Sequence, residues 1–277
     1  MGTNITRGAF ERYWIRPGQP VPDLATVDPQ DTAALPCSKH QIKTATADDI
    51  AEIVRLQEIL YAQAKHAVLV VLQGADTSGK DGAIRRVFGS INPQGVVTTS
   101  FKKPTARELS HDFLWRVHKA VPPVGTIGLF NRSHYEDVLV PRVHGLLPHE
   151  RIEERYGQIN DFERHLALNG VTILKFFLHI SKSEQKARLQ ARVEDPTKRW
   201  KFSPDDLAER KHWDAYREAY RIVLERCSTE AAPWFIVPAN RKWYRDAVIA
   251  RIVRHRLDAF DLAYPTEMPG LDKLHIE

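Results

Sequence analysis

Residues Val68-Leu-Val-Val-Leu-Gln-Gly-Ala-Asp-Thr-Ser-Gly-Lys-Asp-Gly82 decide the fold class of this chain. The apolar, β-branched run at 68–72 is typical of a strand buried on both faces. A glycine turn follows, and the Gly79-Lys80 pair stands at the spacing of a phosphate-binding loop. We predict a helix over 82–89, whose N-terminus would direct backbone N–H groups and a positive dipole end at one point. This arrangement suits a phosphate. The alternative is a glycine-rich turn in an ordinary α/β domain.

The same loop carries two acidic residues that the usual phosphate-binding pattern lacks. Asp81 occupies the position where a Ser or Thr commonly binds Mg²⁺, and Asp76 lies inside the turn. Because a carboxylate beside a phosphate is unfavourable unless a cation lies between them, we expect Asp76, alone or with Asp81, to carry Mg²⁺ to the phosphates. Mn²⁺ is the other metal considered. The phosphate contacts predicted in this loop are Gly74, Thr77, Ser78, Gly79, Lys80, Asp81 and Gly82.

The composition is that of a soluble globular protein. The 277 residues are 27% charged and 43% apolar, which suits one large α/β domain or a domain with a small appendage. No apolar run approaches the length of a membrane span, and the N-terminus lacks the apolar core of a signal peptide. The cysteines, Cys37 and Cys227, are too few for a disulfide framework and fit a reducing cytosol. We therefore expect a cytoplasmic protein with no membrane partner.

The net charge of +5 permits a polyanionic partner without requiring one. Nucleic acid, nucleotides and inorganic polyanions all agree with this charge. The chain shows no helix-turn-helix, zinc-finger or aromatic RNA-binding signature, so nucleic acid is not the expected partner.

Predicted strands and helices alternate along the chain. This alternation favours a mostly parallel sheet with helices on both faces, a three-layer α/β fold. Prolines interrupt residues 1–48, which we expect to form an irregular N-terminal arm, with the main domain at 49–265 and a tail at 266–277. Strands are expected at 68–72, 96–101, 126–130, 171–180 and 234–237, and helices from 46 to about 60 and at 82–89, 105–118, 148–168, 182–193, 203–226 and 242–260.

A second polar motif directly follows the predicted strand at 126–130. Chemistry gathers at the carboxyl ends of parallel strands, so the side chains that come next are candidates for the site. Asn131 could hold a metal-bound water or a phosphate oxygen, and Arg132 could bind phosphates in bidentate fashion. Glu136 and Asp137 supply the negative charge that Asn131 lacks. The alternative is a polar turn whose arginine pairs with the neighbouring acids.

The segment at about 188–210 interrupts the alternation where a phosphate-loop kinase has a mobile lid. Arg188 and Arg192 stand at i, i+4 and share one helical face. Near Trp200, basic side chains could hold phosphates while the indole stacks a nucleobase. Equally, Trp200 could anchor a loop, with the charges on a solvated face. Lys102, Lys103 and Arg142 could line a groove for an extended anion, although each alone is more often a surface residue.

Several ordered motifs resemble those of the polyphosphate kinase 2 family. The resemblance covers roughly residues 50–260 and implies a P-loop kinase fold related to thymidylate kinases, with a helical lid. It also implies Mg²⁺-dependent transfer of phosphoryl groups between inorganic polyphosphate and nucleotides. The motifs are Gly74-Ala-Asp-Thr-Ser-Gly-Lys-Asp-Gly82, Asn92-Pro-Gln-Gly95, Ser100-Phe-Lys-Lys-Pro104, Phe130-Asn-Arg-Ser-His-Tyr-Glu136, Trp200-Lys-Phe-Ser-Pro204 and Ala239-Asn-Arg-Lys-Trp243.

The resemblance also assigns roles to residues. The family's loop acid falls on Asp76, its loop lysine on Lys80 and its strand-end arginine on Arg132, and its lid arginines fall on Arg188 and Arg192. The second motif, Asn131-Arg-Ser-His-Tyr-Glu136, resembles the version found in the subgroup that phosphorylates both nucleoside mono- and diphosphates, here AMP and ADP. A homo-oligomer is also implied. The nucleotide contacts predicted are Asn131, Tyr135, Glu136, Lys198, Trp200 and Lys201.

Two other functions share parts of this pattern. An ATP-dependent nucleoside monophosphate kinase would have the same fold and loop, but Asp76 and the missing Ser or Thr after Lys80 speak against it. A non-catalytic module that binds nucleotide or nucleic acid would use the basic surface and show no turnover. The fold alone does not separate these functions, because function depends on the site.

Overall fold

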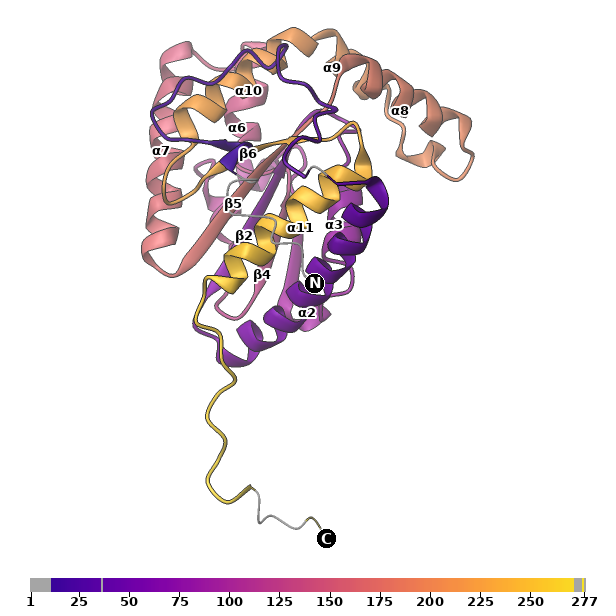
Figure 1. The fold of residues 1–277 in the computed structure, drawn as a ribbon. Helices are drawn as coiled ribbons and strands as arrows, with labels where there is room; N and C mark the ends of the chain where they lie inside the picture. Colours follow the sequence, from indigo (N-terminus) through magenta and orange to yellow (C-terminus); the bar gives the residue numbers. More distant parts are fainter. Residues whose placement is uncertain (1–10, 36, 272–275, 277) are drawn as a thin grey trace.

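The computed structural model describes residues 11–35, 37–271 and 276 of the chain. Its centre is a six-stranded sheet in the order β1-β6-β5-β2-β4-β3 (Figure 1). The pairs among β2 to β6 are parallel, whereas β1 pairs with β6 antiparallel. This confirms the predicted α/β class. The strands are β1 (Trp14–Ile15), β2 (Ala67–Gln73), β3 (Val96–Ser100), β4 (Ile127–Asn131), β5 (Val171–His179) and β6 (Trp234–Pro238).

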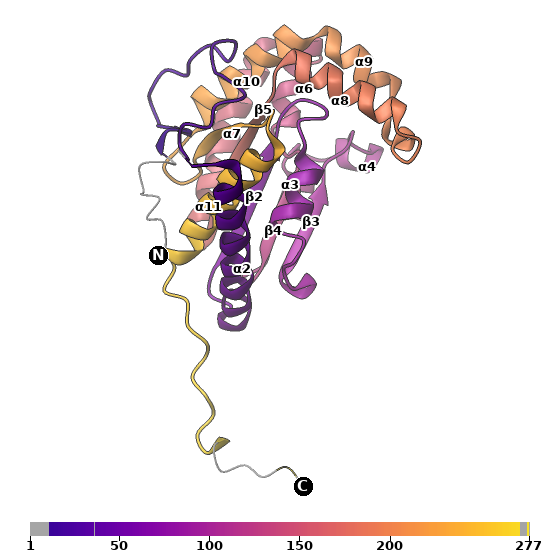
Figure 2. The ribbon, with the colours of Figure 1, turned by 45° about the vertical axis from the view of Figure 1, so that its right-hand side comes forward.

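Helices cover both faces of the sheet (Figures 1 and 2). One buried apolar cluster joins the sheet to α2, α3 and α11, and a second joins it to α6, α7 and α10. Within the described residues, no helix is both long and apolar enough to cross a membrane. The helices are α2 (Lys39–Gln63), α3 (Lys80–Val87), α4 (Ala106–Leu109), α5 (Trp115–His118), α6 (Glu136–His144), α7 (His149–Leu168), α8 (Lys182–Glu194), α9 (Pro204–Lys211), α10 (Trp213–Cys227) and α11 (Lys242–Asp258), with short 3-10 turns at η1 (Pro93–Gly95) and η2 (Arg199–Lys201).

Helix α2 begins at Lys39, seven residues before the start predicted from the sequence. Ser38 caps it, and the side chain of Gln41 returns a hydrogen bond to the backbone N–H of Ser38. Thr46, where the helix was predicted to begin, lies inside it, and its hydroxyl donates to the carbonyl oxygen of Ile42 at 2.6 Å.

Three other helical segments differ from the prediction. No helix was predicted at α6, which contains Pro141 in its interior. The helix expected at 105–118 is two short ones, α4 and α5, since the side chain of Asp112 accepts a hydrogen bond from the backbone of Leu114 and starts a new turn. The helix expected at 203–226 is likewise divided, at His212, into α9 and α10.

The N-terminal arm is more ordered than its prolines indicate. Its strand β1 pairs Trp14 with Phe235 at the edge of the sheet. Next to it, the hydroxyls of Tyr13 and Tyr244 lie 2.8 Å apart and are both buried. The arm therefore adds a sixth strand to the sheet and contacts α11.

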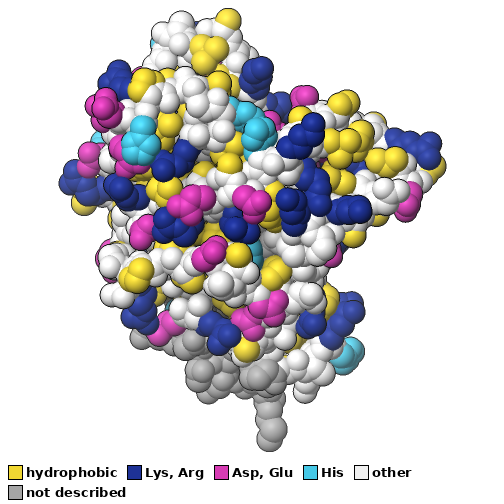
Figure 3. Space-filling view, turned by 90° about the horizontal axis from the view of Figure 1, so that it is seen from above, with side chains coloured by type: hydrophobic (Ala, Val, Ile, Leu, Met, Phe, Trp, Pro, Cys, Tyr) yellow, Lys and Arg dark blue, Asp and Glu magenta, His cyan; other side chains and the backbone are white. Residues whose placement is uncertain are grey.

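The carboxyl ends of β2, β4 and β5 lie at one edge of the sheet, where the strand order reverses around β2. The segment predicted as a lid, which includes α8 and α9, projects from the body of the molecule at this edge (Figure 2). Basic side chains, with acidic ones among them, crowd the side from which it projects (Figure 3). In open α/β sheets this edge is where ligands bind.

Candidate active site

The loop that follows β2 has a backbone that requires glycine at two positions. Gly74 has a φ of +144°, and a Cβ there would lie 2.7 Å from the carbonyl oxygen of Leu178. Gly79 has a φ of +105° and caps α3, which begins at Lys80 and not at the predicted Gly82. The hydroxyls of Thr77 and Ser78 are buried within the loop and have no hydrogen-bond partner in the part of the chain that the structure describes. The N-terminus of α3 therefore opens onto a loop that holds unused polar groups.

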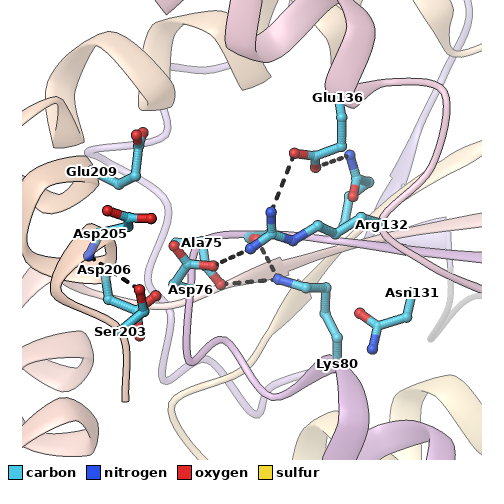
Figure 4. A network of polar contacts seen from close by, with 12 residues as sticks. Ala75, Asp76, Lys80, Asn131, Arg132, Glu136, Ser203, Asp205, Asp206 and Glu209 are labelled. Atoms are coloured by element: carbon cyan, nitrogen blue, oxygen red, sulfur yellow. Dashed lines mark hydrogen bonds and ion pairs between the residues drawn. The ribbon is translucent and has the colours of Figure 1, made fainter. Parts of the chain in front are cut away.

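Lys80 is buried at the mouth of this loop. Its Nζ donates to the carbonyl oxygen of Gly74 at 2.7 Å and to that of Ala75 at 3.3 Å (Figure 4). Burial and the positive charge of Arg132 lower the pKa of Lys80 to about 8. The two neutral carbonyl oxygens only partly compensate a full positive charge. An anion bound in the loop would therefore interact with an ammonium group that is already partly desolvated.

Arg132 connects the loop to the second motif. It has a φ of +61°, uncommon for a residue other than glycine, and its Nη2 donates to Oδ1 of Asp76 at 2.6 Å. Its Nη1 lies 3.6 Å from Glu136, which also accepts a hydrogen bond from Gln73 at 3.1 Å (Figure 4). Burial raises the pKa of Glu136, although Arg132 opposes this shift. The two predicted motifs thus meet through one guanidinium between two carboxylates.

Asn131 and Asp81 also meet. The side-chain amide of Asn131 donates to Oδ1 of Asp81 at 2.5 Å. Their contact bridges the end of β4 and the first turn of α3, beside the loop. The amide occupies one carboxylate oxygen of Asp81, so Asp76 is the better candidate of the two loop acids for a metal.

The lid brings a further acid that the sequence reading missed. Asp206 lies across from Asp76 (Figure 4). Arg192 binds Asp206 with an Nη1–Oδ2 distance of 3.1 Å. Burial and the charge of Asp76 raise the pKa of Asp206. The sequence Ser203-Pro-Asp-Asp206 is typical of a helix N-terminus and does not by itself indicate a functional site. Ser203 does cap α9, which leaves the role of Asp206 visible only in three dimensions.

The donor set at this site fits Mg²⁺ in the way phosphoryl-transfer enzymes bind it. No group of three His, Cys, Asp or Glu side chains among the described residues is placed to hold a metal ion. Mg²⁺, however, commonly takes one or two carboxylates and completes its octahedron with substrate phosphates and water. Asp76 and Asp206 supply two carboxylates of this kind, and the loop hydroxyls of Thr77 and Ser78 have no hydrogen-bond partner among the described residues.

Arg188 holds the loop from the side of α8. Its Nη1 donates to the carbonyl oxygens of Thr77 and Ser78, both at 2.9 Å, and its Nη2 donates to that of Ala239 at 2.6 Å. Its Nε donates to Glu184 at 2.7 Å. These contacts fix the loop against α8 and β6. The phosphate contact predicted for Arg188 remains a prediction, because its nitrogens are used for the backbone here.

Tyr135 was predicted to contact nucleotide, and the structure corrects this. Its side chain is fully buried, and its hydroxyl donates to Glu163 at 2.9 Å and accepts from Nζ of Lys175 at 2.8 Å. His134, the other ring in the motif, is buried beside Glu163 at 3.0 Å. Both rings face the core between α7 and β5, so they fix the segment that carries Arg132 and do not reach a ligand.

The remaining predicted residues lie farther from the loop or make other contacts. Lys102 and Lys103 are exposed just after β3, at the same edge of the sheet as Asn131. Arg142 binds Glu153 of α7, with 3.2 Å between Nη1 and Oε1.

Three predicted nucleotide contacts lie at the tip of the lid. Lys198 binds Asp195, and the indole N–H of Trp200 donates to the carbonyl oxygen of Thr197 at 3.0 Å. The side chain of Trp200 is 78% exposed, so it anchors no part of the core. Lys201 lies in η2, and its side chain is outside the described atoms. Their roles toward nucleotide stay predictions.

Known proteins resemble this chain over almost its whole length. Residues 36–265 match the family model described as polyphosphate kinase 2. An AMP/ADP-polyphosphate phosphotransferase of Meiothermus ruber is 49% identical over 92% of this chain and 96% of its own. An ADP-polyphosphate phosphotransferase of Rhodopseudomonas palustris is 42% identical over 85% and 86%. The crystal structure of polyphosphate kinase 2 from Arthrobacter aurescens superposes with a TM-score of 0.89 at 45% identity, over 94% of this chain and 92% of that one.

Proposed function

The chain belongs to the polyphosphate kinase 2 family, and we propose that it transfers phosphoryl groups from inorganic polyphosphate to AMP and ADP, with Mg²⁺. The Meiothermus ruber relative, which is 49% identical over 96% of its length, is an AMP/ADP-polyphosphate phosphotransferase. The observation that carries the proposal here is the meeting of Asp76, Lys80 and Arg132 at the ends of β2 and β4.

The geometry addresses the main obstacle to this reaction, which is repulsion between two polyanions. Lys80, Arg132 and the N-terminal N–H groups of α3 converge where negative charge would develop on the transferred group. Mg²⁺, when held by Asp76 with Asp206, would neutralise phosphate oxygens and orient them. The protein therefore acts by alignment and charge stabilisation more than by covalent chemistry.

The attacking group needs little help from a base. The terminal phosphate of AMP or ADP is already largely ionised near pH 7, so its oxygen can attack the end phosphorus of the polyphosphate chain directly. The P–O bond that links this phosphorus to the rest of the chain breaks, and polyphosphate shorter by one phosphate leaves. Arg132 and Glu136 stand beside this region, where Glu136 could orient a water or metal near a monophosphate acceptor. The lid, with Arg192 on α8, would exclude water and limit hydrolysis.

The experiment is a donor comparison. The protein is incubated with Mg²⁺ and AMP or ADP, with either polyphosphate or ATP as donor, and the nucleotides are separated by chromatography. Rapid formation of ADP and ATP from polyphosphate supports the proposal. Phosphorylation of AMP by ATP alone at the same rate would favour a nucleoside monophosphate kinase, and nucleotide binding without product would favour a non-catalytic module. A Lys80→Met variant controls for contaminating kinases.

The metal, the oligomeric state and the cellular location belong to the same proposal. Replacing Mg²⁺ with Mn²⁺ in the assay compares the two metals. The homo-oligomer implied by the family resemblance is tested by light scattering, and the expected cytoplasmic location by cell fractionation.

A further inference from the structure

Arg245 is a buried arginine on α11 that lies directly against the phosphate loop. Its side chain is 1% exposed, and its Nε and Nη2 donate to Oδ1 of Asp246 at 2.8 and 2.5 Å. Its Nη1 points the other way, because a Cβ added to Gly79 would lie 2.0 Å from that atom. A Cβ on Gly82 would lie 3.5 Å from Nη2. The guanidinium therefore lies beneath the turn that precedes α3, where only glycine leaves room for it.

The charges around Arg245 do not balance. Asp246, its carboxylate partner, is shared with Arg86, whose Nη1 lies 3.0 Å from Oδ2. Arg188 is also close, since its Nη1 lies 3.7 Å from the same Cβ position on Gly79. Burial and the charges of these three arginines lower the pKa of Lys242, at the first turn of α11. Four basic side chains thus surround the back of the loop.

Among the described residues, Asp246 pairs with both Arg86 and Arg245, and Glu184 pairs with Arg188. Arg245 is buried and shares its carboxylate with a second arginine, so its charge is only partly neutralised. The charge of Arg86, whose side chain is 46% exposed, is screened by solvent. The anion nearest to this surplus would be the one held by the loop on the other side of Gly79.

We propose that Arg245 is a positioning residue of the phosphate loop, which adds positive charge beneath Gly79 and strengthens binding of the polyphosphate donor. This inference rests on the proposed function, in which the loop holds that donor. The guanidinium acts through the backbone and makes no contact with the phosphates. Since Gly79 carries no side chain, the loop is thin at this point and little protein separates the charge from a bound anion.

A purely structural role would be a clasp between α3 and α11. In that case, removing the charge of either Arg245 or Asp246 would change tripolyphosphate binding in the same direction. The electrostatic role predicts opposite directions, because removal of Arg245 takes positive charge from the loop and removal of the Asp246 charge adds it. This sign difference is the basis of the test.

The test measures binding of inorganic tripolyphosphate with Mg²⁺ to the full chain by titration calorimetry, at low and moderate salt. Arg245→Gln is expected to weaken binding about tenfold, with a smaller salt dependence, and Asp246→Asn to strengthen it. Arg86→Gln is the matched control, since Arg86 shares Asp246 but is 46% exposed and should change binding little. Arg245→Lys should retain most of the affinity.

Thermal unfolding of every variant separates folding from binding. If Arg245→Gln does not fold, Asp246→Asn and Arg245→Lys carry the test. Unchanged binding in Arg245→Gln, or weakened binding in Asp246→Asn that is folded, overturns the inference. Failure of the unaltered protein to bind tripolyphosphate would instead count against the proposed function, so the two failures are distinguishable.

Discussion

Asp76 and Arg132 come from the ends of neighbouring strands and are joined by a hydrogen bond of 2.6 Å between Oδ1 and Nη2. In the proposed reaction, Asp76 would bind the metal and Arg132 would bind phosphate, so the two groups that neutralise each other here would act apart. A cation on Asp76 would release the guanidinium toward the incoming phosphates. On this proposal, the contact would hold both groups in place until the substrates arrive.

Asp76→Asn tests the carboxylate of this pair. The change keeps the shape and removes the charge, so we expect turnover to fall by a factor of about 100 or more, since metal-assisted charge stabilisation is worth several kcal/mol. The fold should persist, because Asp76 is partly exposed in a loop. Steady-state rates and circular-dichroism melting measure the two effects. Near-normal turnover with the usual Mg²⁺ dependence would contradict the assignment, and Asp81→Asn is the matched loop control.

Lys80 gives a prediction on pH. Its pKa is lowered to about 8, so the free enzyme loses this positive charge as the pH rises through that value. The ratio kcat/KM for polyphosphate should therefore fall on the alkaline side of about pH 8, and kcat should fall at higher pH, since a bound polyanion favours the charged form. In Lys80→Arg, which is less active, this alkaline limb should disappear because arginine stays protonated. A kcat/KM constant up to about pH 10, the ordinary lysine range, would refute the prediction.

Tyr135→Phe tests the corrected role of this residue. The change leaves Glu163 and Lys175 without a buried hydroxyl partner, so the free energy of unfolding should fall by about 1–3 kcal/mol. The KM for AMP should not change. Denaturant unfolding and initial rates provide the two measurements. Trp200→Ala is the contrasting variant, because its exposed side chain should affect nucleotide binding and leave stability unaltered. A raised KM for AMP in a Tyr135→Phe protein of unchanged stability would instead support the nucleotide contact predicted from the sequence.

Lys102 and Lys103 test the path of a long polyphosphate chain. With both changed to Ala, the KM for long polyphosphate should rise about tenfold, since each exposed cation contributes up to about 1 kcal/mol. The KM for tripolyphosphate should change less, because the lysines follow β3, which is separated from β2 by β4 in the sheet. Lys65→Ala removes an exposed lysine just before β2, at the opposite end of the sheet, and serves as the control. A KM for long polyphosphate that is unchanged in the double variant, or that changes by the same factor as the KM for tripolyphosphate, would remove these lysines from the groove.

The loop and its strand could be predicted from the sequence because their signals are local. Every residue of β2 is buried, as the apolar run indicates, and Gly74 and Gly79 have backbones that glycine favours. Helix α6 was not predicted, and it contains Pro141, a residue that ordinarily disfavours a helix interior.

The other differences depend on tertiary packing. Asp206 reaches the site only because α9 folds back toward β2, and its sequence context indicates a helix cap. Tyr135 lies in the right motif but faces the core, and a motif does not reveal on which side of a strand-to-helix turn each side chain lies. Arg245 meets Gly79 across more than 160 positions in the sequence, so no local pattern could join them.

The short edge strand at the start of the described chain has a practical consequence. Through the Tyr13–Tyr244 hydroxyl contact, it touches the residue that immediately precedes Arg245. A shortened protein that starts after Ile15, or a bulky tag fused close to that point, would disturb the helix that carries the charge behind the loop. Protein engineers who wish to trim or immobilise this enzyme should therefore leave its first strand intact.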